Sequence, residues 1–284
     1  MIQRGRRISI SALGLAGRLA ARAAAGLEWA WLRRELNRDP ELSLIFATFK
    51  QSPESRWSVE ADDVLRLYRL VIRHQPEHIL EFGTGIGLST AAMALALDRL
   101  GRGLPDQLAS LKLGRSRQAG RLTTIEQDQK CLELAKHLIP PELQSPIRFL
   151  RADPEVFQIP AISRWLYFCG YAWRPEPETK FDFVLVDGPA GWYRAGELVS
   201  LQSGEVIRVL PFLRPGALVY IDGRRSLVKT LKRYLGNYLI LHEAGSEYAL
   251  FRRTERTLTS LADLEICDSK RVSPSSLYAH HHPH

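Results

Sequence analysis

Short apolar runs that end in or beside a carboxylate recur through the middle of the chain. Each run has the length and composition of a β-strand, and turn or helix signals separate one run from the next. Because the carboxyl ends of parallel strands meet at one edge of a sheet, the acids are expected to lie together. The five runs are His78–Phe82 (with Glu81), Leu122–Glu126, Ile147–Asp153, Phe181–Asp187 and Ala217–Asp222.

Helical patterns lie between these runs. After the first run an alanine- and leucine-rich segment follows a glycine-rich turn, and other segments repeat apolar residues at helical spacing. The further predicted helices are Val59–His74, with Ser58 as its N-cap, Lys130–Leu138 and Glu197–Phe212.

The alternation of strands and helices predicts an α/β fold. We expect a Rossmann-like, doubly wound sheet of seven mostly parallel strands, preceded by an N-terminal helical extension. Two late strands, Tyr238–His242 and Tyr248–Phe251, flank a turn and predict a closing antiparallel pair, so the sheet has a C-terminal antiparallel strand.

Positive charge is concentrated at the N-terminus. The net charge is +8, and residues 1–38 carry eight arginines against two glutamates, which explains most of the excess. This segment is interpreted as a helix packed on the α/β domain or on a homodimer partner, as a basic amphipathic helix that contacts a membrane surface through residues 1–36, or as a targeting peptide. Arg18 and Arg22 interrupt its apolar run, which is then too short to span a bilayer.

Three connecting segments depart from the simple alternation. The N-terminal helix is expected to end near Asn37–Pro40, followed by an irregular stretch through Gln51–Pro53. Gly101–Gly120 is polar and basic and predicts an inserted loop. Pro154–Lys180 is rich in aromatic residues, which would either stack on a flat substrate at a site entrance or pack a helix into the core.

Composition is that of an ordinary soluble protein. With 284 residues, 45% hydrophobic and 25% charged, the chain suffices for one α/β domain and an appendage. We expect residues 1–56 to form the basic extension, 57–254 the α/β domain and 255–284 a polar, flexible tail. The three cysteines fit neither a zinc pattern nor a disulfide framework, so a cytoplasmic location is expected, with membrane association left open.

The glycine-rich turn after the first run is the strongest motif. Glycines at 83, 85 and 87 allow a tight turn and the close approach of a ligand, and a helix N-terminus follows at Ser89. The third glycine comes one residue too early for a dinucleotide fingerprint. Glu81 would also repel a pyrophosphate. The alternative is a tight strand-to-helix turn that binds no ligand.

These motifs together resemble the class I S-adenosylmethionine-dependent methyltransferases. The resemblance covers roughly residues 57–253, and the Leu-Glu-x-Gly-Thr-Gly-x-Gly-x-Ser-Thr order is most similar to the small-molecule O-methyltransferase branch, which includes catechol O-methyltransferase. Besides the glycine turn, it rests on Glu126, Asp153, Phe181–Gly188 and Leu213–Ala217, the last being similar to the Leu-x-Pro-Gly-Gly turn of the family.

The resemblance implies S-adenosyl-L-methionine as the cofactor and a role for each motif. Asp187 and Asp222 are the implied catalytic residues. The implied cofactor-binding residues are Gly83, Gly85 and Gly87 near the methionine portion, Thr84 and Ser89 in the same segment, Glu81 acting indirectly on the ammonium, Glu126 on the ribose, Asp153 facing the adenine and Asp187 beside the methyl group.

A magnesium ion is a further implication, and the sequence puts it in doubt. The metal-dependent branch holds magnesium with the strand-four aspartate and an Asp-Asn or Asp-Asp pair after strand five, whereas this chain has Asp222-Gly223. Without a metal, Asp187 or Asp222 would act as base, helped by Tyr193 or His242. Three arginines, Arg194, Arg224 and Arg225, would meet an anionic substrate or be solvated loop charges.

The resemblance favours methylation of an oxygen on a small-molecule acceptor, which the sequence does not identify. A nucleic-acid methyltransferase is disfavoured, because the amino-modifying members carry Asn-Pro-Pro-Tyr or Asp-Pro-Pro-Tyr where this chain has Asp187-Gly188-Pro189-Ala190. That same segment loosely resembles spermidine synthase relatives. The last alternative is a non-catalytic scaffold that binds the cofactor.

Overall fold

The structure is a computed structural model that describes residues 34–102, 121–189, 192–195, 197–245 and 247–264. The predictions for the basic segment before residue 34, for most of the Gly101–Gly120 insertion and for the end of the C-terminal tail therefore lie outside the described residues. Within the described ranges, no helix is long and apolar enough to cross a bilayer.

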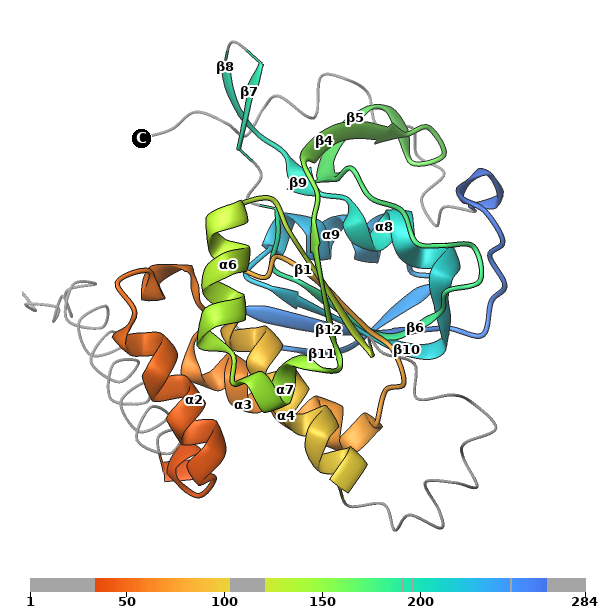
Figure 1. Cartoon of the computed structure of the whole chain (residues 1–284). Coiled ribbons are helices and arrows are strands. Elements are labelled where there is room, and N and C mark those ends of the chain that lie inside the picture. The colour runs from red at the N-terminus through yellow and green to blue at the C-terminus, as the bar shows by residue number, and fades with distance from the viewer. Residues whose placement is uncertain (1–33, 103–120, 190–191, 196, 246, 265–284) are drawn as a thin grey trace, which may run out of the picture.

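A mostly parallel seven-stranded sheet runs through the centre of the described part of the chain (Figure 1). Its order is β11-β12-β10-β6-β1-β2-β3, and β12 is antiparallel to both of its neighbours. The predicted sheet is therefore confirmed, including the closing antiparallel strand. The strands are β1 (Ile79–Phe82), β2 (Leu122–Glu126), β3 (Ile147–Arg151), β6 (Phe181–Val186), β10 (Leu213–Asp222), β11 (Leu239–Ala244) and β12 (Tyr248–Arg253).

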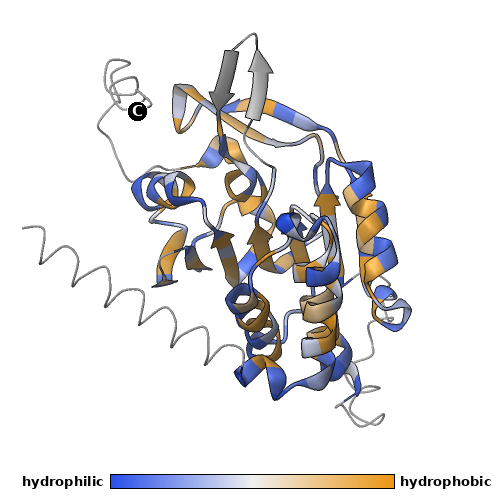
Figure 2. Cartoon of the chain, turned by 90° about the vertical axis from the view of Figure 1, so that its left-hand side faces the viewer, coloured by the Kyte–Doolittle hydropathy of each residue, from blue (hydrophilic) through white to orange (hydrophobic). Residues whose placement is uncertain are grey.

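Helices cover both faces of this sheet, as a doubly wound fold requires (Figure 1). One face carries α2 (Pro40–Gln51), α3 (Ala61–His74), α4 (Leu88–Arg102), α6 (Gln129–Leu138) and α7 (Pro141–Gln144). The other carries α8 (Glu205–Val209) and α9 (Arg225–Tyr234), with the short helices η2 (Leu210–Phe212) and η3 (Leu261–Asp263). Figure 2 shows the apolar residues of these helices turned toward the sheet.

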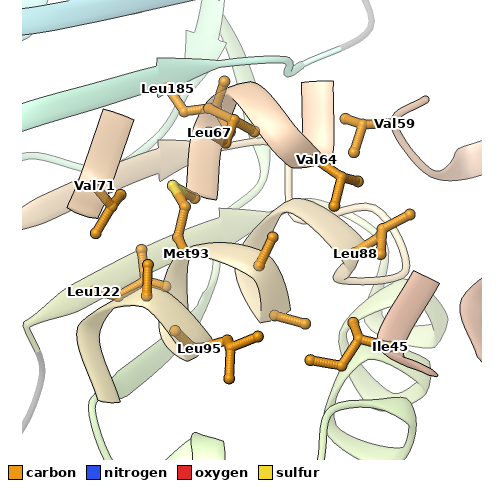
Figure 3. Packing of buried hydrophobic residues seen from close by; sticks show 14 of the residues in the cluster. Ile45, Val59, Val64, Leu67, Val71, Leu88, Met93, Leu95, Leu122 and Leu185 are labelled. Atoms are coloured by element: carbon orange, nitrogen blue, oxygen red, sulfur yellow. The ribbon is translucent and has the colours of Figure 1, made fainter. Parts of the chain in front are cut away.

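Helix α4 is buried on nearly all sides. Residues 88–97 are all buried, because α2 and α3 both pack against α4. Its alanines allow this close packing. In Figure 3 the side chain of Met93 lies on the side of Val71 and Leu67 of α3, and that of Leu95 lies on the side of Ile45 of α2. This layer fixes the helix that follows the glycine turn.

The start of α2 corrects one prediction. A helix was expected to end near Asn37–Pro40, and residues 34–37 are helical and end there, but the irregular stretch expected to follow is wrong because Pro40–Gln51 is helical. Asp39 caps this helix by accepting a hydrogen bond from Leu42 N at 3.1 Å, and proline is favourable in the first helical turn. The Asp-Pro pair therefore begins a helix here. Arg99 of α4 pairs with the same Asp39 and so holds α2 in place.

The start of α3 corrects a second prediction. Ser58 is not its N-cap, because the helix begins at Ala61 and Glu60 precedes it. Ser58 ends the short helix η1 (Ser55–Trp57) and donates its hydroxyl to Ser55 O at 2.6 Å.

Two connections form strands where helices were expected. Pro154–Lys180 contains a hairpin of β4 (Pro154–Ile159) and β5 (Ser163–Tyr171), so no helix packs its aromatic residues. Residues 197–212 were predicted to form one helix, but the helical part begins only at Glu205. Before it lie β7 (Trp192–Ala195), β8 (Glu197–Ser200) and β9 (Gln202–Ser203).

Candidate active site

The glycine turn lies at the carboxyl end of β1 and is packed against protein on two sides. Gly83 and Gly85 have positive φ angles of 95° and 52°, which other residues rarely adopt. A side chain at Gly83 would clash with the backbone of Gly188, and one at Gly85 would clash with the carbonyl of Trp57. The turn is therefore packed between the loop after β6 and the short helix η1.

Glu126 contacts this turn directly. Its Oε2 accepts a hydrogen bond from Gly85 N at 2.9 Å, and its Oε1 accepts from Gln127 N at 2.8 Å and Asp128 N at 3.1 Å. Only 7% of Glu126 is exposed. The structure thus brings together the strand-two acid and the glycine turn, which are separated by some forty residues in the sequence.

Glu81 lies beneath the turn and is fully buried. It accepts hydrogen bonds at 2.5 Å from the hydroxyls of Ser89 and Thr90 in the first turn of α4. Burial raises the pKa of Glu81 to about 7, although these hydroxyls act in the opposite direction. Beside it, the Thr84 and Thr124 hydroxyls are 2.6 Å apart and join the turn to β2. These side chains hold the turn against the sheet and the helix.

Asp153 lies beyond β3 and is exposed. Its carboxylate pairs with Arg151 Nη2 at 2.8 Å. An open pocket of about 490 Å³ lies at the ends of β2 and β3, and its lining residues are Gln127, Asp128, Gln129, Arg151 and Pro154. The pocket therefore adjoins both predicted acids, Glu126 and Asp153.

Asp187 directly follows β6, and Asp222 is the last residue of the neighbouring strand β10. Burial at this crowded edge raises the pKa of Asp187 to about 7, and the Arg224 guanidinium acts in the opposite direction. Burial, with the negative charges of Asp63 and Asp187, raises the pKa of Asp222 to about 8. The two aspartates therefore interact electrostatically, as their predicted common site requires.

No known family profile and no curated protein sequence matches the chain, but solved structures do. The O-methyltransferase TomG from Streptomyces achromogenes, in complex with SAM, is 20% identical over 76% of this chain and 90% of its own, with a TM-score of 0.43. An O-methyltransferase from Bacillus cereus in complex with SAH is 15% identical over 76% and 91%, with a TM-score of 0.47. SAH-bound methyltransferase PaMTH1 from Podospora anserina is 13% identical over 82% and 96%, with a TM-score of 0.51.

The likeness to PaMTH1 and the order of the strands decide the fold. The chain has the class I methyltransferase fold. In this fold the strand β12 is inserted antiparallel between β10 and β11, and the candidate residues lie at the opposite end of the sheet from the loops that enter β1 and β2.

An adenosyl group fits this methyltransferase-fold site better than a dinucleotide does. The pocket has the volume of a small-molecule site. Asp128 lines the pocket, Glu126 and Asp153 are next to its lining residues in the sequence, and these carboxylates would repel a pyrophosphate. A carboxylate has about four acceptor positions, of which backbone N–H groups use three at Glu126, so one position is available to a ribose hydroxyl.

A magnesium ion fits poorly. Gly223 offers no side-chain ligand, and the Arg224 guanidinium already lies 3.8 Å from Asp187 Oδ1. Within the described residues, no group of three or more His, Cys, Asp or Glu side chains is placed to hold a metal ion. Magnesium demands a near-octahedral set of oxygen ligands, and a positive side chain in the same position opposes its binding.

Some residues predicted to assist the base or to meet an anionic substrate do not lie beside the two aspartates. His242 is exposed on the edge strand β11, and β12 lies between this strand and β10. Arg225 is exposed and pairs with Glu247 at 2.9 Å, as a solvated loop charge would. The side chains of Tyr193 and Arg194 lie outside the described part of the structure.

Two aromatic residues of the Pro154–Lys180 segment pack against β1 rather than at an entrance. Tyr171 is buried and stacks on Phe82 of β1 with ring centroids 6.1 Å apart, while Trp173 meets the same ring edge-on. The Tyr171 hydroxyl also lies so close to Gly188 that a side chain there would clash with it. These aromatic rings fix the loop that carries Asp187.

Asp63 is a residue of the site that the sequence reasoning missed. It accepts a hydrogen bond from the Tyr220 hydroxyl at 2.6 Å and pairs with Arg66 at 3.3 Å. Burial raises the pKa of Asp63. A signal was present, because Asp63 lies on the apolar face of α3, in helical register with the buried Leu67 and Leu70.

Proposed function

We propose that the protein is an S-adenosyl-L-methionine-dependent methyltransferase that methylates an oxygen of a small molecule. The observation that carries the proposal is the hydrogen bond between Gly85 N and Glu126 Oε2 at the carboxyl edge of a class I methyltransferase fold. It joins a turn suited to close ligand approach to an acid suited to ribose recognition.

The cofactor, when bound, supplies a methyl group on a positively charged sulfur, which is already activated for transfer. The protein then has to hold the ribose, align the acceptor and remove its proton. Glu126 accepts a ribose hydroxyl beside the turn. Glu81, bonded to Ser89 and Thr90, keeps the turn rigid from below and adds negative charge near the ammonium.

Asp222 is the proposed base. Among the described residues, no hydrogen bond to its carboxylate is found, so its oxygens are available to an acceptor hydroxyl. In the transfer, the acceptor O–H proton passes to Asp222, a new oxygen–methyl bond forms, and the methyl–sulfur bond breaks with its electron pair left on sulfur. Asp187 lies beside this reaction and is held by Arg224.

Calorimetric titration of the full chain with S-adenosylhomocysteine tests the cofactor site. We expect one binding site, and Glu126→Gln should weaken binding at least about tenfold, because it removes a charge-assisted hydrogen bond worth about 1.5–3 kcal/mol. Glu133→Gln is the matched control, since Glu133 lies exposed on α6 and pairs only with Gln129 in the described structure.

A turnover assay with S-adenosylmethionine and a panel of catechols, phenols and carboxylic acids follows the titration. Methylation of an oxygen supports the full proposal. Cofactor binding without methylation of any acceptor would favour the non-catalytic scaffold, and a chain that binds no cofactor would contradict both.

A further inference from the structure

Arg224 is fixed between the ends of the two central strands that carry the aspartates. It follows Asp222 and Gly223 directly, at the start of α9. Its Nη2 donates a hydrogen bond to the backbone carbonyl of Asp187 and lies 3.8 Å from Asp187 Oδ1. About a fifth of the side chain remains exposed, at 21%. The guanidinium is therefore held at the site rather than extended into solvent.

The charges around this guanidinium are mostly negative. Asp187 and Asp222 both interact with it electrostatically, and each is also influenced by Asp63. Arg66 pairs with Asp62 and Asp63 and so offsets the negative charge of these two carboxylates. Arg224 is a cation that offsets part of the negative charge of Asp187 and Asp222.

One donor of Arg224 has no partner. Within the described residues, Nε is buried and makes no hydrogen bond. A buried N–H group without a partner is costly, and such groups are uncommon in folded proteins. A substrate atom that accepts a hydrogen bond would remove this cost, and an oxygen carrying negative charge would do so best.

We propose that the Arg224 guanidinium takes the place of a divalent metal ion at this site and holds the acceptor oxygen as it loses its proton. The identity of that oxygen rests on the proposed function, whereas the position of the cation does not. Arg224 stays protonated throughout. The proton goes to Asp222, the negative charge that develops on the oxygen meets the Nε–H, and the methyl group then transfers with its former bonding pair left on sulfur.

The absence of a side chain at Gly223 agrees with the replacement of a metal ion by the Arg224 guanidinium. Gly223 has a φ of 59°, and a side chain added there would meet no atom within 4 Å. The space beside Asp222 is therefore open, the positive φ favours glycine there, and Gly223 provides no third ligand. The fixed guanidinium attracts an anionic oxygen of the acceptor, and its positive charge beside Asp187 opposes the binding of a free divalent ion by the two carboxylates.

Titration of the full chain with manganese(II), followed by electron paramagnetic resonance of the free ion, tests the proposal. Manganese takes the same oxygen ligands as magnesium. We expect no saturable binding to the wild type in the millimolar range. Arg224→Gln should gain one manganese site, and adding Asp187→Asn to that variant should remove it.

Arg225→Gln is the matched control and should behave as the wild type, because Arg225 pairs with Glu247 away from the aspartates. Circular dichroism establishes that each variant is folded. Manganese binding to the wild type that Asp187→Asn abolishes would overturn the proposal, and so would a folded Arg224→Gln variant that gains no site. If Arg224→Gln does not fold, the wild-type titration decides alone. Failure of the proposed function would appear separately, as a chain that does not bind S-adenosylhomocysteine.

Discussion

Single side chains at the carboxyl edge of the sheet determine what chemistry the site can perform. Burial raises the pKa of Asp222 to about 8, with Asp63 and Asp187 adding to the effect. A carboxyl group with this pKa exchanges its proton near neutral pH, as a general base must. The same residue in water would stay ionised and would be a weaker base.

The dependence of turnover on pH follows from this pKa. Asp222 accepts a proton only when it is ionised, so kcat should fall as the pH is lowered through about 8 and reach a plateau above it. Asp222→Asn should lower kcat by about 10²–10⁴-fold while changing the affinity for S-adenosylhomocysteine little. A profile that is flat from acidic to alkaline pH, or an Asp222→Asn variant with wild-type kcat, would contradict the role of Asp222.

The sequence was sufficient to predict residues that end strands and insufficient for residues that act across elements. Glu126 and Asp222 could be placed because a strand end has a fixed position in a parallel sheet. Asp63 comes from a helix, and its partner Tyr220 is distant in the sequence. The replacement of a metal by Arg224 depends on a guanidinium position that spacing alone does not give.

At the scale of elements, the helix α2 and the short helix η1 support the glycine turn from the N-terminal side. Leu42, Ile45 and Phe49 of α2 are buried in the core that contains α4. After α2, η1 brings the carbonyl of Trp57 against Gly85. Residues 40–57 therefore contribute to the turn that is proposed to bind the cofactor.

Phe49→Ala tests this support. Phe49 is fully buried, so its truncation should lower the free energy of unfolding by about 3–5 kcal/mol. Leu44→Ala is the control on the same helix, because Leu44 is 69% exposed, and it should change stability by less than about 0.5 kcal/mol. Denaturant unfolding measures both. Equal effects of the two variants would show that α2 does not pack on α4 as described.

Elements with a clear pattern of hydrophobic residues could be predicted from the sequence, whereas the segments that connect them could not. The run Phe181–Val186 is apolar except for Asp182 and forms the central strand β6. Residues 197–203 carry apolar residues at spacings that fit a short helix or two short strands, and the strand pairing of Phe168 with Gln202 decides between them. That pairing involves the β4–β5 hairpin, whose existence the sequence did not indicate.

At the scale of the whole molecule, the order of the strands creates the site. The connections reverse direction on either side of β1, so the ends of β1, β2 and β6 open onto a common edge. The glycine turn and Glu126 lie at this edge, and the pocket of about 490 Å³ continues it toward Asp153. A ligand that has an adenosyl group at one end and a reactive methyl group at the other would extend from the pocket to Asp187.

The most direct test of this account is a crystal structure of the full chain with S-adenosylhomocysteine. We predict that a ribose hydroxyl lies within hydrogen-bond distance of Glu126, that the adenine occupies the pocket beside Asp153 and that the sulfur faces Asp187. A nucleoside bound elsewhere, or a Glu126 carboxylate that makes no contact with it at saturating ligand, would contradict the proposed function.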